Sequence, residues 1–249
     1  MPEKYDALLT RLKQIEDLNA ASSLLNWDLE VMMPEEGNKA RARQLATLSR
    51  VLHDMRTSDE TGRLLEEAEK EMAGAPYDSD EAAMVRIARY DFDQNTKLPT
   101  DFVAEFTQLT AEAHDVWAKA RADSNFRMFE PAMSKITEMV MRSTEYLGYK
   151  VHPYDALIDQ FERGMTAAEV SRIFEAHKPA LIALIAQVGK VQDRVSNKPV
   201  HQEFDTDKQR EFALSVVKKF GFDFSRGRQD VSVHPFCTNF SRNDVRMTT

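Results

Sequence analysis

Histidines are the side chains most suited to bind a metal ion or to act as a base near neutral pH. The sequence has six: His53, His114, His152, His177, His201 and His234. A helical zinc peptidase needs two histidines four residues apart, with a glutamate beside the first, so that both rings reach one metal ion. No two histidines here have that spacing. We therefore expect no metal ligand and no catalytic residue within this chain.

Other catalytic motifs are also missing from the sequence. Cys237 is the only cysteine, which excludes an intrachain disulfide and a multi-cysteine zinc site. A lone cysteine in a strand is usually packing and not a nucleophile. The sequence has no glycine-rich phosphate loop and no G-x-S-x-G motif. These observations argue against nucleotide-binding and serine-hydrolase mechanisms.

The most unusual residues lie near the end of the sequence, in His234-Pro235-Phe236 and in Asp244-Val245-Arg246-Met247-Thr248. Pro235 indicates an edge or irregular position, since proline cannot donate to a ladder. An edge strand can bind an extended peptide through main-chain hydrogen bonds. Arg246 could bind a carboxylate, and Asp244 could orient that arginine or end the turn. A capped hairpin with an internal ion pair explains the pattern equally well.

Helices must position these residues, because apolar side chains recur at helical spacing along most of the chain. We predict helices at about 5–32, 35–55, 58–72, 79–95, 99–122, 131–146, 154–161, 166–188 and 207–219. Thr57 with Glu60, and Thr166 with Glu169, have the spacing of capping boxes. Residues 126–129 are predicted to form an irregular connection.

The final segment changes character. The tetrad Ser241-Arg242-Asn243-Asp244 between two β-prone runs predicts a β-hairpin at about 231–249. With 8 glycines and 9 prolines the chain is too poor in turns for a sandwich or barrel. We predict an all-α fold of long antiparallel helices, about 5–220, with this small C-terminal hairpin. No repeat or linker divides the chain, so residues 1–249 are predicted to form a single helical unit.

Charge and hydropathy exclude other classes. The formal charge is −8, from 33 Lys and Arg against 41 Asp and Glu, which disfavours nucleic-acid binding. No stretch of about 18 apolar residues occurs, so no membrane span is expected. The start of the sequence lacks the pattern of a signal peptide. A cytoplasmic protein is expected.

The H-P-F and D-x-R-x-T motifs, together with other stretches in the same order, resemble the carboxypeptidase Taq family of metallocarboxypeptidases. The other stretches are Asn26-Trp27-Asp28, Met33-Pro34, Arg43-Gln44, Leu98-Pro99 with Trp117, 153–157 and Glu162-x-Gly164-Met165-Thr166. The resemblance covers essentially the whole chain. In that family an H-E-x-x-H helix follows the D-x-R-x-T strand; its two histidines and a later glutamate bind zinc.

The resemblance implies that this chain is the amino-terminal half of such an enzyme, with every metal ligand beyond Thr249. It implies half of a grooved, gluzincin-type fold, commonly a homodimer, that removes C-terminal residues from peptides. His234, Phe236, Asp244, Arg246 and Thr248 would then line or brace the substrate side of the groove. The chain alone would be inactive and would bind no zinc.

An alternative reading is a non-catalytic helical interaction module, or a pseudo-enzyme. The absence of metal ligands favours it, whereas the family-like hairpin has no evident use in a scaffold.

Overall fold

A computed structural model describes residues 2–249, and their contacts divide into two compact units. The first unit comprises the described residues up to Leu147 together with Ser225–Thr249, and the second comprises Gly148–Phe224. The single unit expected over 1–249 stays a prediction.

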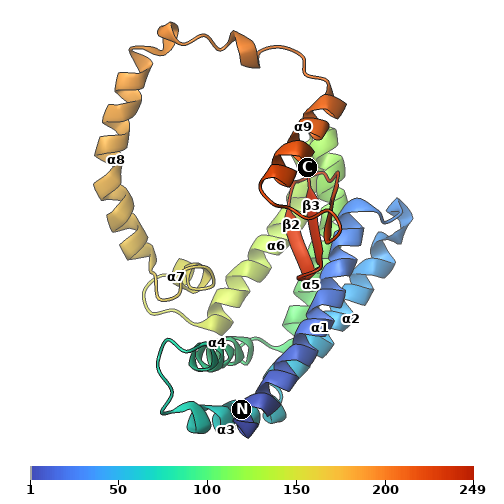
Figure 1. The fold of residues 1–249 in the computed structure, drawn as a ribbon, viewed down its shortest axis with the longest axis vertical. Coiled ribbons are helices and arrows are strands. Elements are labelled where there is room, and N and C mark those ends of the chain that lie inside the picture. Colours follow the sequence, from blue (N-terminus) through green and yellow to red (C-terminus); the bar gives the residue numbers. More distant parts are fainter. Residues whose placement is uncertain (1) are drawn as a thin grey trace. The chain divides into compact units, whose positions relative to one another are not determined.

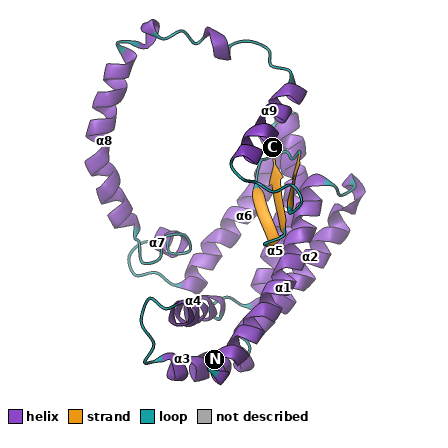
Figure 2. Ribbon diagram, in the orientation of Figure 1, coloured by secondary structure: helices purple, strands orange, loops and turns teal. Residues whose placement is uncertain are grey.

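The described residues are mostly helical, as Figure 2 shows. The helices are α1 (Glu3–Val31), α2 (Asn38–Thr57), α3 (Asp59–Met72), α4 (Asp80–Asn95), α5 (Thr100–Ala122), α6 (Phe126–Leu147), α7 (Pro153–Ile158), α8 (Ala167–Gly189) and α9 (Thr206–Lys219). Short 3-10 turns lie at Glu35–Gly37, Gln192–Arg194 and Lys198–Val200. The strands are β1 (Gly227–Asp230), β2 (Cys237–Ser241) and β3 (Asp244–Thr248). The predicted all-α fold with a small C-terminal sheet is confirmed.

The first unit is built on long helices that pack in series: α1 on α2, α2 on α5 and α5 on α6 (Figure 1). Its hydrophobic core has two centres. One joins α1, α3 and α4 around Leu8 and Leu65, and the other joins α1, α2 and α5 around Leu45 and Ala111. Leu8 and Leu45 are completely buried. Removing such apolar surface from water is the main force that holds these helices together.

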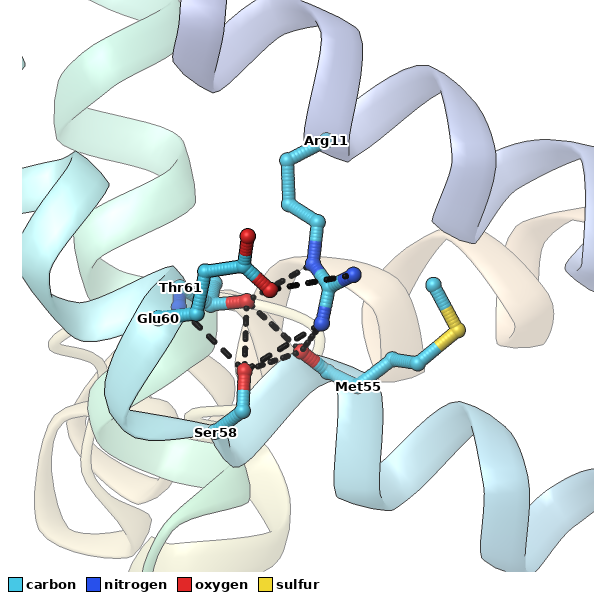
Figure 3. Close-up of polar contacts among 5 residues, drawn as sticks. All are labelled: Arg11, Met55, Ser58, Glu60 and Thr61. Carbon is cyan, nitrogen blue, oxygen red and sulfur yellow. Dashed lines mark hydrogen bonds and ion pairs between the residues drawn. The ribbon is translucent and has the colours of Figure 1, made fainter.

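A polar junction fixes α1 against the turn between α2 and α3 (Figure 3). The Arg11 guanidinium donates to the Thr61 hydroxyl at 3.1 Å and to the Ser58 hydroxyl at 3.3 Å. Ser58, and not Thr57, caps α3, because its Oγ accepts the Thr61 backbone N–H at 3.2 Å. The Thr57 hydroxyl instead donates to the His53 carbonyl. The predicted Thr57–Glu60 capping box was therefore wrong by one residue.

Helix α6 begins earlier than its proline suggested. The sequence predicted an irregular connection at 126–129, but the helix starts at Phe126 and carries Pro131 inside it. Ser124 adopts a φ of 49°, so the chain turns sharply right after α5. The Met128 N–H then donates to the Asn125 carbonyl, which forms the first turn. The prediction failed because the reversal uses a serine in a conformation usually adopted by glycine.

The sheet has three strands in the order β1-β3-β2, so β3 is central. The antiparallel β2–β3 pair, with its turn at Arg242 and Asn243, is the predicted hairpin. Strand β1, which pairs in parallel with β3, was not predicted, and residues 231–236 form no strand. Cys237, considered above as a lone cysteine in a strand, begins β2. Strand β2 also packs against helix α1.

The second unit contains α7, α8 and α9. The predicted Thr166–Glu169 capping box is confirmed, since each side chain accepts the other residue's backbone N–H. Helix α7 has a similar box between His152 and Asp155, and Asp155 also accepts the Ala167 N–H at 2.8 Å. Helix α8 has no buried residue. None of the described helices, in either unit, has both the length and the apolar character to cross a membrane.

Candidate functional site

Polar side chains gather on one face of the sheet. Residues two apart in a strand point to the same side, so Asp244, Arg246 and Thr248 share a face of β3. In the parallel register Arg228 lies beside Arg246 and Asp230 lies beside Thr248, which adds two charged residues of β1 to that face. The D-x-R-x-T spacing thus becomes a single surface built from two strands.

The two arginines of this face are paired within their own strands. Arg246 donates from Nε and Nη2 to both Asp244 oxygens, at 2.5 and 3.1 Å. Arg228 donates from Nε to Asp230 at 2.7 Å and from Nη2 to its other oxygen. The hydrogen bond from Arg246 holds the pKa of Asp244 below its ordinary value, and the bond to Asp230 raises the pKa of Arg228. Such bidentate pairs fix a guanidinium in orientation as well as in place.

Trp27 of α1 supplies the apolar support for these charges. Its side chain is 5% exposed, and the Arg246 Cζ lies 4.6 Å and the Arg228 Cζ 5.5 Å from its ring centroid. Arg246 also lies 5.4 Å from the Phe240 ring. Arg246, with 16% of its side chain exposed, is therefore enclosed by two aromatic rings and its own carboxylate partner.

Thr248 ties the H-P-F segment to the sheet. The Thr248 hydroxyl accepts the Phe236 N–H at 2.8 Å, and the Phe236 carbonyl accepts the Thr248 N–H at 2.9 Å. The Ser232 hydroxyl lies 2.7 Å from both the Thr248 hydroxyl and the His234 carbonyl oxygen. Thr248 is 6% exposed. The two motifs singled out in the sequence are thus bonded to each other.

His234 is positioned from α5. Its ring makes an edge-on contact with Trp117, with centroids 6.5 Å apart and an angle of 81° between the ring planes. Arg121, one turn further along α5, donates to the Val233 carbonyl and lies 5.8 Å over Trp117. Trp117 also lies 5.6 Å from the His114 ring, centroid to centroid. The His234 side chain itself is exposed.

His114 forms a partly buried pair with Glu30 of α1. The Nε2 atom lies 2.7 Å from a Glu30 oxygen, and Nδ1 lies 3.8 Å from Asp115. Both contacts are ion pairs by distance, because neither ring nitrogen has a partner in hydrogen-bond geometry among the described atoms. His114 has 15% of its side chain exposed and Glu30 has 28%. The interaction with Glu30 raises the pKa of His114, although burial opposes this effect.

A hollow of about 310 Å³ lies between α1 and the start of β2. Its walls come from one face of α1 and from the residues that follow Pro235: Ser23, Asn26, Trp27, Glu30, Phe236, Cys237 and Thr238. The Trp27 indole N–H is buried without a hydrogen-bond partner among the described atoms. The hollow therefore places polar side chains beside the aromatic rings of Trp27 and Phe236.

A metal site cannot be assembled from the side chains at hand. Among residues 2–249 no three His, Cys, Asp or Glu side chains come together in a way that could bind a metal ion. The metal implied by the resemblance therefore finds no fitting group of ligands among the described side chains.

Several contributors to the site were not singled out as site residues from the sequence, among them Trp27, Arg228, and the pair Glu30 and His114. Trp27 carried a signal, since Asn26-Trp27-Asp28 is one of the stretches that resemble the family. The pair Glu30 and His114 had none, because the two residues are distant in the sequence and only the fold brings them together. Arg228 had none either, because its place beside Arg246 and over Trp27 comes only from the fold.

Comparison with known proteins bears on the family resemblance seen in the sequence. The family model described as Carboxypeptidase Taq (M32) metallopeptidase matches residues 7–249. The chain is 33% identical to Carboxypeptidase 1 of Bacillus subtilis (strain 168), over 96% of this chain and 47% of that protein. It is also 33% identical to Thermostable carboxypeptidase 1 of Pyrococcus furiosus, over 99% of this chain and 49% of the relative.

Solved structures agree. The crystal structure of BsuCP matches with a TM-score of 0.92 and 31% identity, covering 99% of this chain and 49% of that chain. The structure of Pyrococcus furiosus carboxypeptidase (Apo-Mg) matches with a TM-score of 0.81 and 33% identity, covering 100% and 50%. The chain spans about half the length of the curated relatives it matches. The resemblance seen in the sequence is confirmed, and the chain belongs to the carboxypeptidase Taq (M32) family of metallopeptidases.

Proposed function

We propose that this chain forms one wall of the substrate groove of a metallocarboxypeptidase that removes C-terminal residues from peptides. The family match supports the class of reaction. The observation that carries the proposal is the bonding of the H-P-F segment to the D-x-R-x-T strand through Thr248 and Phe236. This bonding joins both motifs into one surface beside a hollow lined by Trp27 and Phe236.

The residues of this wall have different roles in the proposal. Arg246 is an anchor and not a substrate grip, because Asp244 and two aromatic rings already surround its guanidinium. Thr248 braces the H-P-F segment. The exposed His234 and the half-buried Phe236 are the side chains that would face the peptide.

The proposed metal is zinc, with ligands in the part of the relatives' length that this chain does not span. The family name supports a metal, and the lack of a suitable ligand group among residues 2–249 supports placing its ligands elsewhere. We further propose a cytoplasmic homodimer. The family resemblance supports the dimer, and the single cysteine accords with a reducing compartment.

A chimera tests the proposal. This chain would replace the matching half of Bacillus subtilis Carboxypeptidase 1, and hydrolysis of N-terminally blocked peptides would be measured. We expect release of the C-terminal residue from free peptides and none from C-terminally amidated ones. The chain alone should release nothing.

Within the chimera, His234→Ala should lower kcat/KM, whereas His201→Ala, an exposed histidine of the second unit, should not. A folded chimera that binds zinc and cleaves no peptide would contradict the proposed reaction. Equal effects of the two substitutions would contradict the role of His234 in the groove.

A further inference from the structure

The H-P-F segment has few contacts that fix the direction of the His234 side chain. Residues 231–236 form no strand. Their backbone is bonded by Thr248 at Phe236, by Ser232 at His234 and by Arg121 at Val233. These bonds fix the main chain, whereas the imidazole of His234 meets one aromatic partner, Trp117. The orientation of His234 therefore depends on where Trp117 lies.

Trp117 in turn contacts the rings of two histidines. Its ring centroid is 6.5 Å from that of His234 and 5.6 Å from that of His114. Trp117 and His114 are three residues apart on α5, so they share one side of that helix. A change in the charge or position of His114 reaches His234 through this single indole.

We propose that Glu30 and His114 are positioning residues, which orient His234 through Trp117. The pair connects α1 to α5 by a contact of 2.7 Å between His114 Nε2 and a Glu30 oxygen. Glu30 lines the same hollow as Phe236, so the pair borders the surface to which the H-P-F segment belongs. The inference rests on the proposed function only for the statement that His234 faces a peptide.

The charged surroundings of His114 define how the pair responds to pH. Glu30 faces it from α1, and Asp115 faces it from its own helix at 3.8 Å. Helices α2 and α6 also pack on α5, but no charged side chain of either forms an ion pair with His114 in the described part of the chain. Both neighbours are carboxylates, so they favour the protonated imidazole.

The sign of the pH dependence follows from these neighbours. Because the pKa of His114 is raised in the folded chain, the pair is fully formed below the ordinary histidine pKa of about 6.5. It is lost as the pH rises through the folded pKa. Above that pH, Glu30 loses its counter-charge and Trp117 loses the imidazolium beside it, so the orientation of His234 should change.

Two-dimensional NMR of the imidazole C–H groups tests this in the 249-residue chain, without metal or peptide. The His234 signal should shift in step with the His114 signal as the pH rises through the pKa of His114, which lies above its ordinary value. Glu30→Gln should move the His114 step to lower pH, and His114→Gln should abolish it at His234. Trp117→Phe should weaken the coupling while His114 still titrates.

The controls separate positioning from mere stability. Far-UV circular dichroism of each variant must match the parent chain, and the isosteric Glu30→Gln serves if His114→Gln does not fold. A His234 signal that does not move with the His114 step in the folded parent chain would overturn the inference. That result would not contradict the proposed function. An inactive chimera in a chain whose two histidines are coupled would contradict the proposed function but not the inference about His114 and His234.

Discussion

Helices α5 and α8 are each 23 residues long, yet their surroundings are opposite. Helix α5 packs against α2 and α6 and buries five residues, among them Phe102 and Ala111. Helix α8 carries a longer apolar stripe and buries none, with Phe174 65% and Ile185 61% exposed. The comparison teaches that apolar periodicity predicts a helix and its apolar face. It does not predict whether another described element packs against that face.

Core truncation gives the largest expected contrast between the two helical regions. Leu45→Ala, at a fully buried position between α1, α2 and α5, should lower the free energy of unfolding by about 2–5 kcal/mol. Leu184→Ala on α8, at a residue 55% exposed, should change it by less than about 0.5 kcal/mol. Urea unfolding followed by far-UV circular dichroism measures both. A comparable loss for Leu184→Ala would mean that α8 is covered in solution.

The sequence could predict what depends on local pattern. Helical periodicity located all nine described α-helices, and the polar tetrad Ser241-Arg242-Asn243-Asp244 located the β2–β3 hairpin. Strand β1 was missed because Gly227-Arg228-Gln229-Asp230 has no β-branched or aromatic residue. It is a strand because the edge of β3 accepts it and because Asp230 is buried there.

The candidate site was predictable only where it depends on local sequence pattern. His234, Phe236, Asp244, Arg246 and Thr248 were selected as motif residues, and the structure supplies the bonds that join Phe236 to Thr248 and Asp244 to Arg246. The packing of Trp27 on Arg246 and the pairing of Glu30 with His114 depend on how α1 lies against the sheet and α5. Such contacts have no signature in local sequence.

A buried hydroxyl should matter more than a half-buried one on the same sheet. Thr248→Val removes the acceptor of the Phe236 N–H and should cost about 1–3 kcal/mol, because a partly buried donor is left unpaired. Thr238→Val, at a half-buried position on β2, is the control of matched shape and should cost less. Thermal unfolding of the two variants measures the difference. Equal losses would show that Thr248 acts through packing and not through its hydrogen bonds.

Removing a helix cap should have different effects in the two units: a loss of global stability in the first and local fraying in the second. Ser58→Ala removes both the cap of α3 and a partner of Arg11. The free energy of unfolding of the first unit should therefore fall by about 0.5–2 kcal/mol. Thr166→Ala removes a cap of similar geometry on α8. Its effect should be confined to faster hydrogen exchange in the first turns of that helix. A global loss of stability from Thr166→Ala would indicate that α8 unfolds together with the core.

The smallest effect is expected from an exposed ion pair on α8. Lys178 lies 3.4 Å from Glu175, three residues earlier, and both side chains are more than half exposed. Lys178→Ala should cost about 0.2–0.5 kcal/mol, because water screens the pair and both side chains lose rotamer freedom to form it. Hydrogen exchange of α8 in low and high salt measures this cost, with Arg63→Ala on α3 as the exposed counterpart in the first unit. A loss above about 1 kcal/mol for Lys178 alone would require shielding from solvent. In that case the exposure of α8, on which the comparison with α5 depends, would not describe the chain in solution.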